Sequence, residues 1–263
     1  MTEARLDVTL LGTGTSTGVP VPACDCAVCR SGDPRDQRTR CSLLLGFNGR
    51  NILIDAATDL RQQALRESIR HIDAVLFTHT HADHIHGIDD LRPFNVKGAD
   101  PIPVYAGPEA VTSMKRNFTY IFGNGERSGY CPRLTLQPIN GAFELFGLPI
   151  VPVPLKHGSG TSLGFRIGPV AYLTDCSAIP DTSLPLLEGL ELLILDALRF
   201  RPHASHFNIA GAIEQADRIG AAQTLLTHLS HEVLHGKHAE GLPDSVAFAY
   251  DGQKLSFTMA EQR

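Results

Sequence analysis

Five apolar runs along the chain each end in a residue that can bind a metal ion. The terminal residues are three histidines and two aspartates: His79, His157, Asp175, Asp196 and His228. Near-continuous apolar runs are typical of strands whose two faces are both covered. Ligand-type residues at strand ends can converge along one sheet edge, a common place for α/β active sites. Any one of them could be a surface residue that closes a strand, but their repetition favours a shared site.

Two further alternations of apolar and polar residues predict hairpins. Residues 43–55 form one such pattern, which turns at Asn48-Gly49 and ends in Asp55. Residues 246–250 and 254–257, separated by an Asp-Gly turn signal, predict a second hairpin that closes the chain.

Apolar residues at helical spacing predict helices between the strands. Residues 59–70 form one helix, and a short helix is expected to end before Pro93. Asn208 is suited to cap a later helix that stops at Gly220. The helix over 59–70 is interpreted as a packing element.

The pattern from about residue 95 to 140 is irregular and rich in glycine, proline and aromatic residues. Two interpretations stay open: an insertion that shapes the substrate pocket, or a segment whose charges are simply solvated. We find no linker and no long repeat, so residues 1–263 are predicted to form a single domain.

Composition narrows the classes of protein to consider. Of the 263 residues, 43% are hydrophobic and 19% charged, and the net charge is −5. No run approaches the roughly 20 apolar residues that cross a bilayer, so no membrane partner is expected. The acidic balance argues against nucleic acid as a partner. A small phosphorylated substrate is expected instead, and the sequence is compatible with a homodimer.

The segment Thr78–His84 concentrates the candidate chemistry. It reads Thr-His-Thr-His-Ala-Asp-His and follows the apolar run 74–77. Imidazole and carboxylate together suit zinc, manganese or iron, and the spacing can face two neighbouring ions. The alternative is a solvated loop that happens to contain histidines.

A cysteine cluster forms a second candidate metal site. Cys24, Cys26 and Cys29 are typical of a structural tetrahedral zinc site that lacks one ligand, although three unligated thiols are the alternative. They lie too close together for a disulfide framework, and the N-terminus shows no signal peptide, so a reduced, cytoplasmic location is expected. The glycines at 12, 14 and 18 miss the dinucleotide-binding spacing and predict a tight turn.

The order of these motifs resembles the metallo-β-lactamase superfamily. That resemblance implies an αββα four-layer sandwich with two divalent metal ions. Residue by residue, it assigns one ion to His79, His81 and His157 and the second to Asp83, His84 and His228, with Asp175 bridging. Asp83 is also assigned to catalysis. Asp55 would support the ligands from behind, since metal-bound imidazoles need orienting partners.

The chain also resembles the phosphoribosyl 1,2-cyclic phosphate phosphodiesterase family of the carbon–phosphorus lyase pathway. The shared motifs are Leu-Gly-Thr-Gly, Cys-x-Cys-x-x-Cys, Leu-Thr-His-x-Ser-His and a terminal Leu-Pro…Asp-Gly. This resemblance implies a structural zinc held by Cys24, Cys26, Cys29 and His231. It assigns the general acid to His206, with His203 as second choice, whereas His86 has no place among the ligands.

The expected function is hydrolysis of a small, cyclic phosphodiester by hydroxide held between two zinc or manganese ions. Three alternatives stay open. They are a tRNA 3′-processing endonuclease, a thioester or lactam hydrolase, and a non-catalytic metal- or cofactor-handling protein on the same fold.

Overall fold

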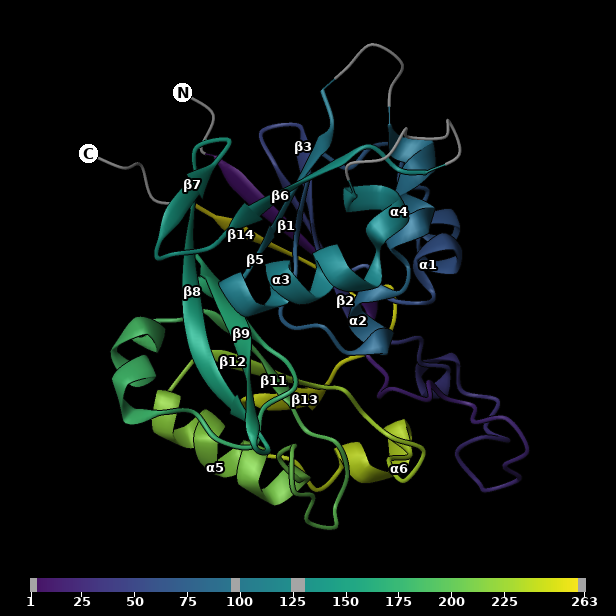
Figure 1. Ribbon diagram of the computed structural model, residues 1–263. Coiled ribbons are helices and arrows are strands. Elements are labelled where there is room, and N and C mark those ends of the chain that lie inside the picture. Colours follow the sequence, from purple (N-terminus) through teal and green to yellow (C-terminus); the bar gives the residue numbers. More distant parts are fainter. Residues whose placement is uncertain (1–3, 96–99, 124–130, 260–263) are drawn as a thin grey trace.

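The fold is a sandwich of two β-sheets with helices on both outer faces (Figure 1). It is described from a computed structural model, which covers residues 4–95, 100–123 and 131–259. The four layers confirm the predicted αββα architecture.

Seven strands build the first sheet, mainly from the N-terminal half of the chain. Their order across the sheet is β14-β1-β2-β3-β4-β5-β6. The bounds are β1 Arg5–Gly12, β2 Ser42–Phe47, β3 Arg50–Ile54, β4 Ala74–Leu76, β5 Ile102–Ala106, β6 Leu134–Pro138 and β14 Lys254–Thr258. Strands β3 to β6 run parallel to one another, so their carboxyl ends lie at one end of the sheet.

The second sheet has the order β13-β12-β11-β10-β9-β8-β7. Its strands are β7 Phe143–Leu145, β8 Leu148–His157, β9 Gly160–Ile167, β10 Val170–Leu173, β11 Leu192–Asp196, β12 Gln223–Thr227 and β13 Val246–Phe248. Strands β10 to β13 are parallel, whereas β7, β8 and β9 are joined as antiparallel hairpins.

Helices cover the outer face of each sheet. Contacts join α1, α3 and α4 to the first sheet, and α5 and α6 to the second. The helices are α1 Leu60–Arg66, α2 Ala82–Ile85, α3 Pro108–Asn117, α4 Thr119–Phe122, α5 Ile209–Ile219 and α6 His235–Ala239, with 3-10 turns at Pro34–Asp36, Ile88–Phe94 and Asp181–Leu187. Across the described ranges, no helix combines the length and apolar character that a membrane span requires.

Three buried apolar clusters fill the spaces between the four layers. The central cluster joins the two sheets and includes Leu45 and Ile194. A second cluster lies between the first sheet and its helices, around Phe77 and Met114. The third lies between the second sheet and α5. Because both faces of the inner strands are buried, those strands appear in the sequence as continuous apolar runs.

Most of the predicted elements are confirmed. The hairpin that turns at Asn48-Gly49 is β2–β3, and both turn residues have positive φ. Asn208 caps α5 by accepting a hydrogen bond from Gly211 N, and Gly220 ends it in the left-handed conformation. The helix predicted over 59–70 ends earlier, at Arg66.

The prediction of irregular structure over residues 95–140 is wrong for the part of that segment within the described ranges. Strands β5 and β6 extend the first sheet in parallel register, and α3 and α4 lie between them in the chain. Residues 96–99 and 124–130 lie outside the described residues. The short strands and their prolines hid a regular βα unit, because neither strand is long enough to show a clear period.

The predicted closing hairpin is also wrong. β13 pairs in parallel with β12 in the second sheet, whereas β14 pairs with β1 in the first. The turn between them therefore crosses from one sheet to the other. The Asp251 carboxylate accepts hydrogen bonds from the backbone N and the hydroxyl of both Thr13 and Thr39, at 2.5–2.9 Å. These four donors hold the crossing in place.

Replacing Asp251 with Ala should lower the free energy of unfolding by at least about 3 kcal/mol. The substitution leaves several buried donors without a partner, each of which costs about 1–3 kcal/mol. Urea unfolding followed by circular dichroism would measure the change. The matched control is Asp181→Ala, which removes an 87% exposed carboxylate paired with Arg218 and should cost under about 1 kcal/mol. Equal losses in the two variants would contradict the role of Asp251.

Candidate metal centre

The candidate ligands of the metal centre come from both sheets. His79 and His81 follow β4 of the first sheet, and Asp83 and His84 lie in the short helix α2. The remaining ligands lie at strand ends of the second sheet: His157 is the last residue of β8, Asp175 follows β10, and His228 follows β12. The prediction of a single sheet edge is therefore corrected, because the site forms where the ends of both sheets meet.

The first group consists of His79, His81, His157 and Asp175, whose ligand atoms all lie within 4.8 Å of one another. His157 Nε2 is 3.2 Å from His81 Nδ1. Two imidazole nitrogens bound to one tetrahedral zinc at 2.0–2.1 Å would stand about 3.3 Å apart. The spacing of this pair thus fits a shared ion.

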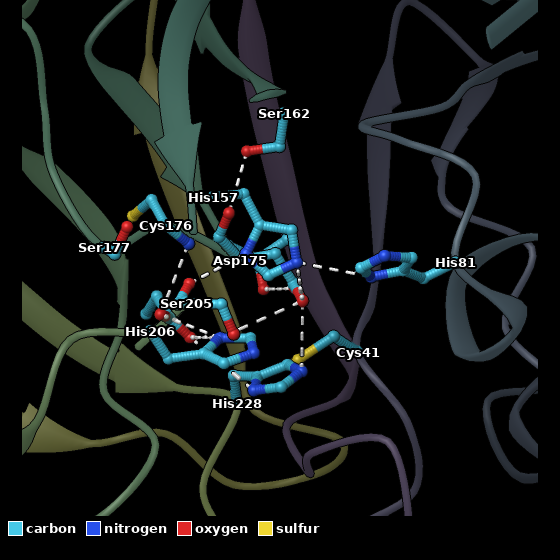
Figure 2. A network of polar contacts seen from close by, with 12 residues as sticks. Cys41, His81, His157, Ser162, Asp175, Cys176, Ser177, Ser205, His206 and His228 are labelled. Atoms are coloured by element: carbon cyan, nitrogen blue, oxygen red, sulfur yellow. Dashed lines mark hydrogen bonds and ion pairs between the residues drawn. The ribbon is translucent and has the colours of Figure 1, made fainter. Parts of the chain in front are cut away.

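The second group consists of Asp83, His84, Asp175 and His228. His84 Nε2 lies 3.0 Å from Asp175 Oδ2 and 3.4 Å from Asp83 Oδ2, and His228 Nε2 lies 3.4 Å from Asp175 Oδ1. Asp175 belongs to both groups. Figure 2 shows it at the centre, with His81 to its right and His206 and His228 below it.

Neighbouring groups fix which nitrogen of several imidazoles faces the centre. His84 Nδ1 lies 2.7 Å from Asp55 Oδ2, and His157 Nδ1 donates to the Ser205 carbonyl oxygen at 2.8 Å. Asp55 also accepts hydrogen bonds from the backbone N and hydroxyl of Thr78. With Nδ1 occupied, each ring presents Nε2 to the centre, as metal-bound histidines commonly do.

Several buried nitrogens in the centre lack a hydrogen-bond partner among the described residues. They are Nε2 of His79 and His84 and both ring nitrogens of His228. Although His84 Nε2 lies 3.0 Å from Asp175, the angle does not suit a hydrogen bond. Buried polar atoms are rarely left unpaired. These atoms therefore fit a cation that all of them face, and the cluster has the composition of a dinuclear metal site.

The protonation of two members of the centre, His79 and Asp175, also suits metal ligands. Burial, together with the nearby His84, holds the pKa of His79 well below its ordinary value, so this ring stays neutral. Burial alone would raise the pKa of Asp175, but His228, His84 and His79 outweigh it and hold that pKa well below its usual range. Neutral imidazole and ionised carboxylate are the forms that bind metal.

Three residues of the centre adopt a backbone conformation that is unfavourable for most side chains. Asp55, Asp175 and His228 have φ values of 63°, 54° and 60°. Asp55 and His228 directly follow a strand and Asp175 comes two residues after one, and the left-handed turn redirects each side chain away from the strand's alternation. Such strain costs about 1–3 kcal/mol and commonly occurs at functional sites.

Asp196 and His206 form a third group beside the ligands. His206 Nδ1 lies 3.1 Å from Asp196 Oδ2, and this carboxylate also accepts hydrogen bonds from the backbone N of Cys176 and Phe207. The centroid of the His206 ring lies 4.5 Å from that of His228 and 4.8 Å from that of His157. The sequence marked Asp196 as the end of an apolar run, but not as the partner of His206.

The other histidines near the centre lie outside it. His203 is exposed, 5.2 Å from the His206 ring, and partial burial and the nearby His206 lower its pKa. His86 packs edge-on against Phe118 and belongs to none of the ligand groups within the described ranges. This agrees with its expected exclusion from the ligands.

The structure brings Cys24, Cys26, Cys29 and His231 together into a separate group. His231 Nδ1 lies 3.2, 3.8 and 3.6 Å from the three sulfur atoms in that order. Tetrahedral zinc with bonds of 2.3 Å to sulfur and 2.0–2.1 Å to nitrogen would place these atoms about 3.6 Å apart. The group therefore has the composition and spacing of a structural metal site.

A buried ion pair supports the loop that carries His231. Arg38 and Asp36 side chains are 0% and 1% exposed and lie 2.9 Å apart. Arg38 also donates to the carbonyl oxygens of Ser230 and Val233, which flank His231. Since a charge buried without partners is costly, this arrangement keeps the loop close to the cysteines.

Comparison with known proteins agrees with this geometry. The family described as a beta-lactamase superfamily domain matches residues 50–229. A solved structure described as a new diphosphatase from the PhnP family is 42% identical, with a TM-score of 0.92 and coverage of 98% of this chain and 99% of that chain. Zinc-bound PqqB from Methylobacterium extorquens shares the fold, with 20% identity, a TM-score of 0.78 and coverage of 95% and 99%.

A curated relative is much longer than this chain. The octanoyltransferase of Porphyromonas gingivalis is 41% identical over 248 residues, which are 92% of this chain but 50% of that protein. The chain thus spans half the length of that relative.

Replacing Cys26 with Ser should remove one equivalent of tightly bound metal and leave the histidine–aspartate centre loaded. A hydroxyl does not substitute for thiolate as a zinc ligand. Metal content per chain, measured by inductively coupled plasma mass spectrometry, checks this expectation. Cys131→Ser, at a cysteine outside the group, is the matched control and should keep all of its metal. Full metal content in the Cys26 variant would contradict the structural site.

Proposed function

The chain belongs to the beta-lactamase superfamily, and we propose that it is a dinuclear-metal phosphodiesterase acting on a small phosphodiester. Phosphoribosyl 1,2-cyclic phosphate is the first candidate substrate, by resemblance. The observation that carries the proposal is the position of His206 beside both ligand groups, 4.5 Å from His228 and 4.8 Å from His157. The 42% identity to a PhnP-family diphosphatase supports chemistry at phosphorus.

His79, His81 and His157 would hold one ion, and Asp83, His84 and His228 the other, with Asp175 between them. Zinc and manganese both suit these ligands. When bound, such a pair activates water at neutral pH and neutralises charge on the phosphate oxygens.

The protein's own contribution begins with His206. Asp196 accepts a hydrogen bond from His206 Nδ1–H, so Nε2 is the atom left to carry a proton toward the leaving oxygen. His203 is a weaker candidate because its ring is exposed. Among the described contacts, its Nδ1 lies near the Ser205 hydroxyl and its ring near His206, and none of them pairs it with a carboxylate.

Asp83 has a ligating and a positioning role in this proposal. Burial alone would raise its pKa, but the imidazoles of His228 and His84, 3.8 and 3.4 Å away, outweigh burial and hold that pKa well below the usual range. Asp83 therefore stays ionised, the form in which a carboxylate binds a divalent ion.

The proposal predicts hydrolysis of phosphodiesters by protein of known metal content. A panel of bis(p-nitrophenyl) phosphate, phosphoribosyl 1,2-cyclic phosphate, 2′,3′-cyclic nucleotides and precursor tRNA should show turnover of one or more small diesters. Removing the metal with a chelator should abolish it, and adding zinc or manganese should restore it. Activity on thioesters or lactams alone would reject the proposal, as would a fully loaded protein with no turnover.

Replacing His206 with Ala should lower kcat about 10²–10⁴-fold, the range for a positioned general acid, while metal content stays unchanged. His203→Ala is the matched control and should change kcat less than about tenfold. Adding Asp196→Asn to the His206 variant should cause little further loss, because groups that act as a unit are not additive. Loss of metal together with activity would instead assign His206 to ion binding.

A further inference from the structure

A groove beside the first ligand group has no part in the chemistry described above. Its volume is about 990 Å³, at the upper end of the roughly 300–1,000 Å³ common for small-molecule sites, and its walls include His79 and Thr80. The groove lies between the start of α3, residues 139–142 and the β8–β9 hairpin. Figure 1 shows α3 beside that hairpin, and a Cβ built on Gly107 would lie 3.5 Å from Leu163 Cδ1.

The lining of the groove changes with distance from the metal centre. Near the centre the walls carry hydroxyl groups from Thr80, Thr161 and Ser162. The remaining lining is mainly aliphatic: Pro108, Ala110, Ile139, Ala142, Val151, Pro152, Pro154, Leu163 and Leu186. Substrate recognition in such pockets combines apolar walls with a few polar groups at the reacting end.

The groove is an open extension of the protein core. Leu163 packs against the cluster between the two sheets, yet it is half-buried. Along β8, strand β7 pairs only with residues 148–150, so the following part of that edge is uncovered by β7. Pro152 and Pro154 remove two N–H donors from this part of β8, which disfavours an added peptide strand.

The charge of the groove excludes a second phosphate as its preferred occupant. Glu109 is the charged side chain in the lining, and the described residues that form the walls include no lysine or arginine. A phosphate group is normally held by cationic side chains or by helix N-terminal amides. The start of α3 does line the groove, but its first turn carries Pro108, which has no N–H, and the carboxylate of Glu109. The single carboxylate would repel an anion.

We infer that this groove binds an uncharged, apolar ester group of the phosphodiester whose phosphate lies at the metal centre. The inference rests on the proposed function and narrows its substrate class. One ester oxygen then carries an aliphatic or aryl group that extends from His79 past Thr80 toward Leu163. Phosphoribosyl 1,2-cyclic phosphate carries a second anionic group and would use the groove poorly, so this inference favours diesters with an uncharged ester group over that first candidate.

Two series of compounds with methyl, butyl and octyl chains test this inference. Alkyl p-nitrophenyl phosphodiesters report kcat/KM on metal-loaded protein, and the matching alkylphosphonates report Kd by calorimetry. We expect kcat/KM to rise, and Kd to fall, about threefold to fourfold for each methylene that enters the groove. The gradient should end when the groove is filled.

Variants separate the groove from the chemistry. Ala142→Glu places a charge at an exposed lining position, and it should flatten the gradient with chain length. Leu163→Ala should weaken the gradient with chain length. Leu65→Ala, at a 64% exposed position on α1, should leave that gradient unchanged.

The outcomes distinguish the two proposals. A gradient that Ala142→Glu removes supports the groove assignment. Equal Kd and kcat/KM for all chain lengths would overturn it, while hydrolysis of the esters would still support the phosphodiesterase. A gradient in Kd without turnover of any ester would overturn the phosphodiesterase and leave the apolar binding groove.

Discussion

The carboxylate of Asp175 is the constraint on which the rest of the centre depends. It is 2% exposed and lies between imidazoles from both sheets. A buried charge is tolerated only where opposite charge and hydrogen bonds surround it. Thr174 donates a hydrogen bond to Oδ2 at 2.7 Å, and histidines from the segment after β4, from α2, from β8 and from the end of β12 lie around the carboxylate. The carboxylate therefore requires that both sheets be packed before its environment is complete.

The same dependence on distant segments appears around the centre. Asp251, near the C-terminus, holds Thr13 and Thr39 near the N-terminus. Arg38 holds the carbonyl groups on either side of His231. These buried polar contacts join parts of the chain about 190–240 residues apart. Both the cysteine group and the histidine–aspartate centre therefore depend on the same packing of distant segments.

The features that could be predicted from the sequence are local ones, which depend on a single stretch of the chain. The strand-end ligands were visible because largely apolar runs stop at a ligand-type residue, as at His157 at the end of β8 and Asp175 just beyond β10. The Asn208 cap and the Asn48-Gly49 turn were visible for the same local reason. Turn chemistry alone could not tell whether Asp251-Gly252 joins two paired strands or crosses between sheets, because the difference lies in the partners β12 and β1. The pairing of Asp196 with His206 was hidden likewise, since it depends on the path of the loop between them.

The left-handed backbone at Asp55, Asp175 and His228 sets stability and activity against each other. Glycine adopts such a φ without strain. Replacing any of the three residues with glycine would therefore relax the backbone and at the same time delete a ligand or its support. Selection for a more stable fold and selection for a metal centre thus act in opposite directions at these positions. A stabilised descendant of this chain that had lost its chemistry would be expected to lose it first at one of these three bends, with the sandwich around it intact.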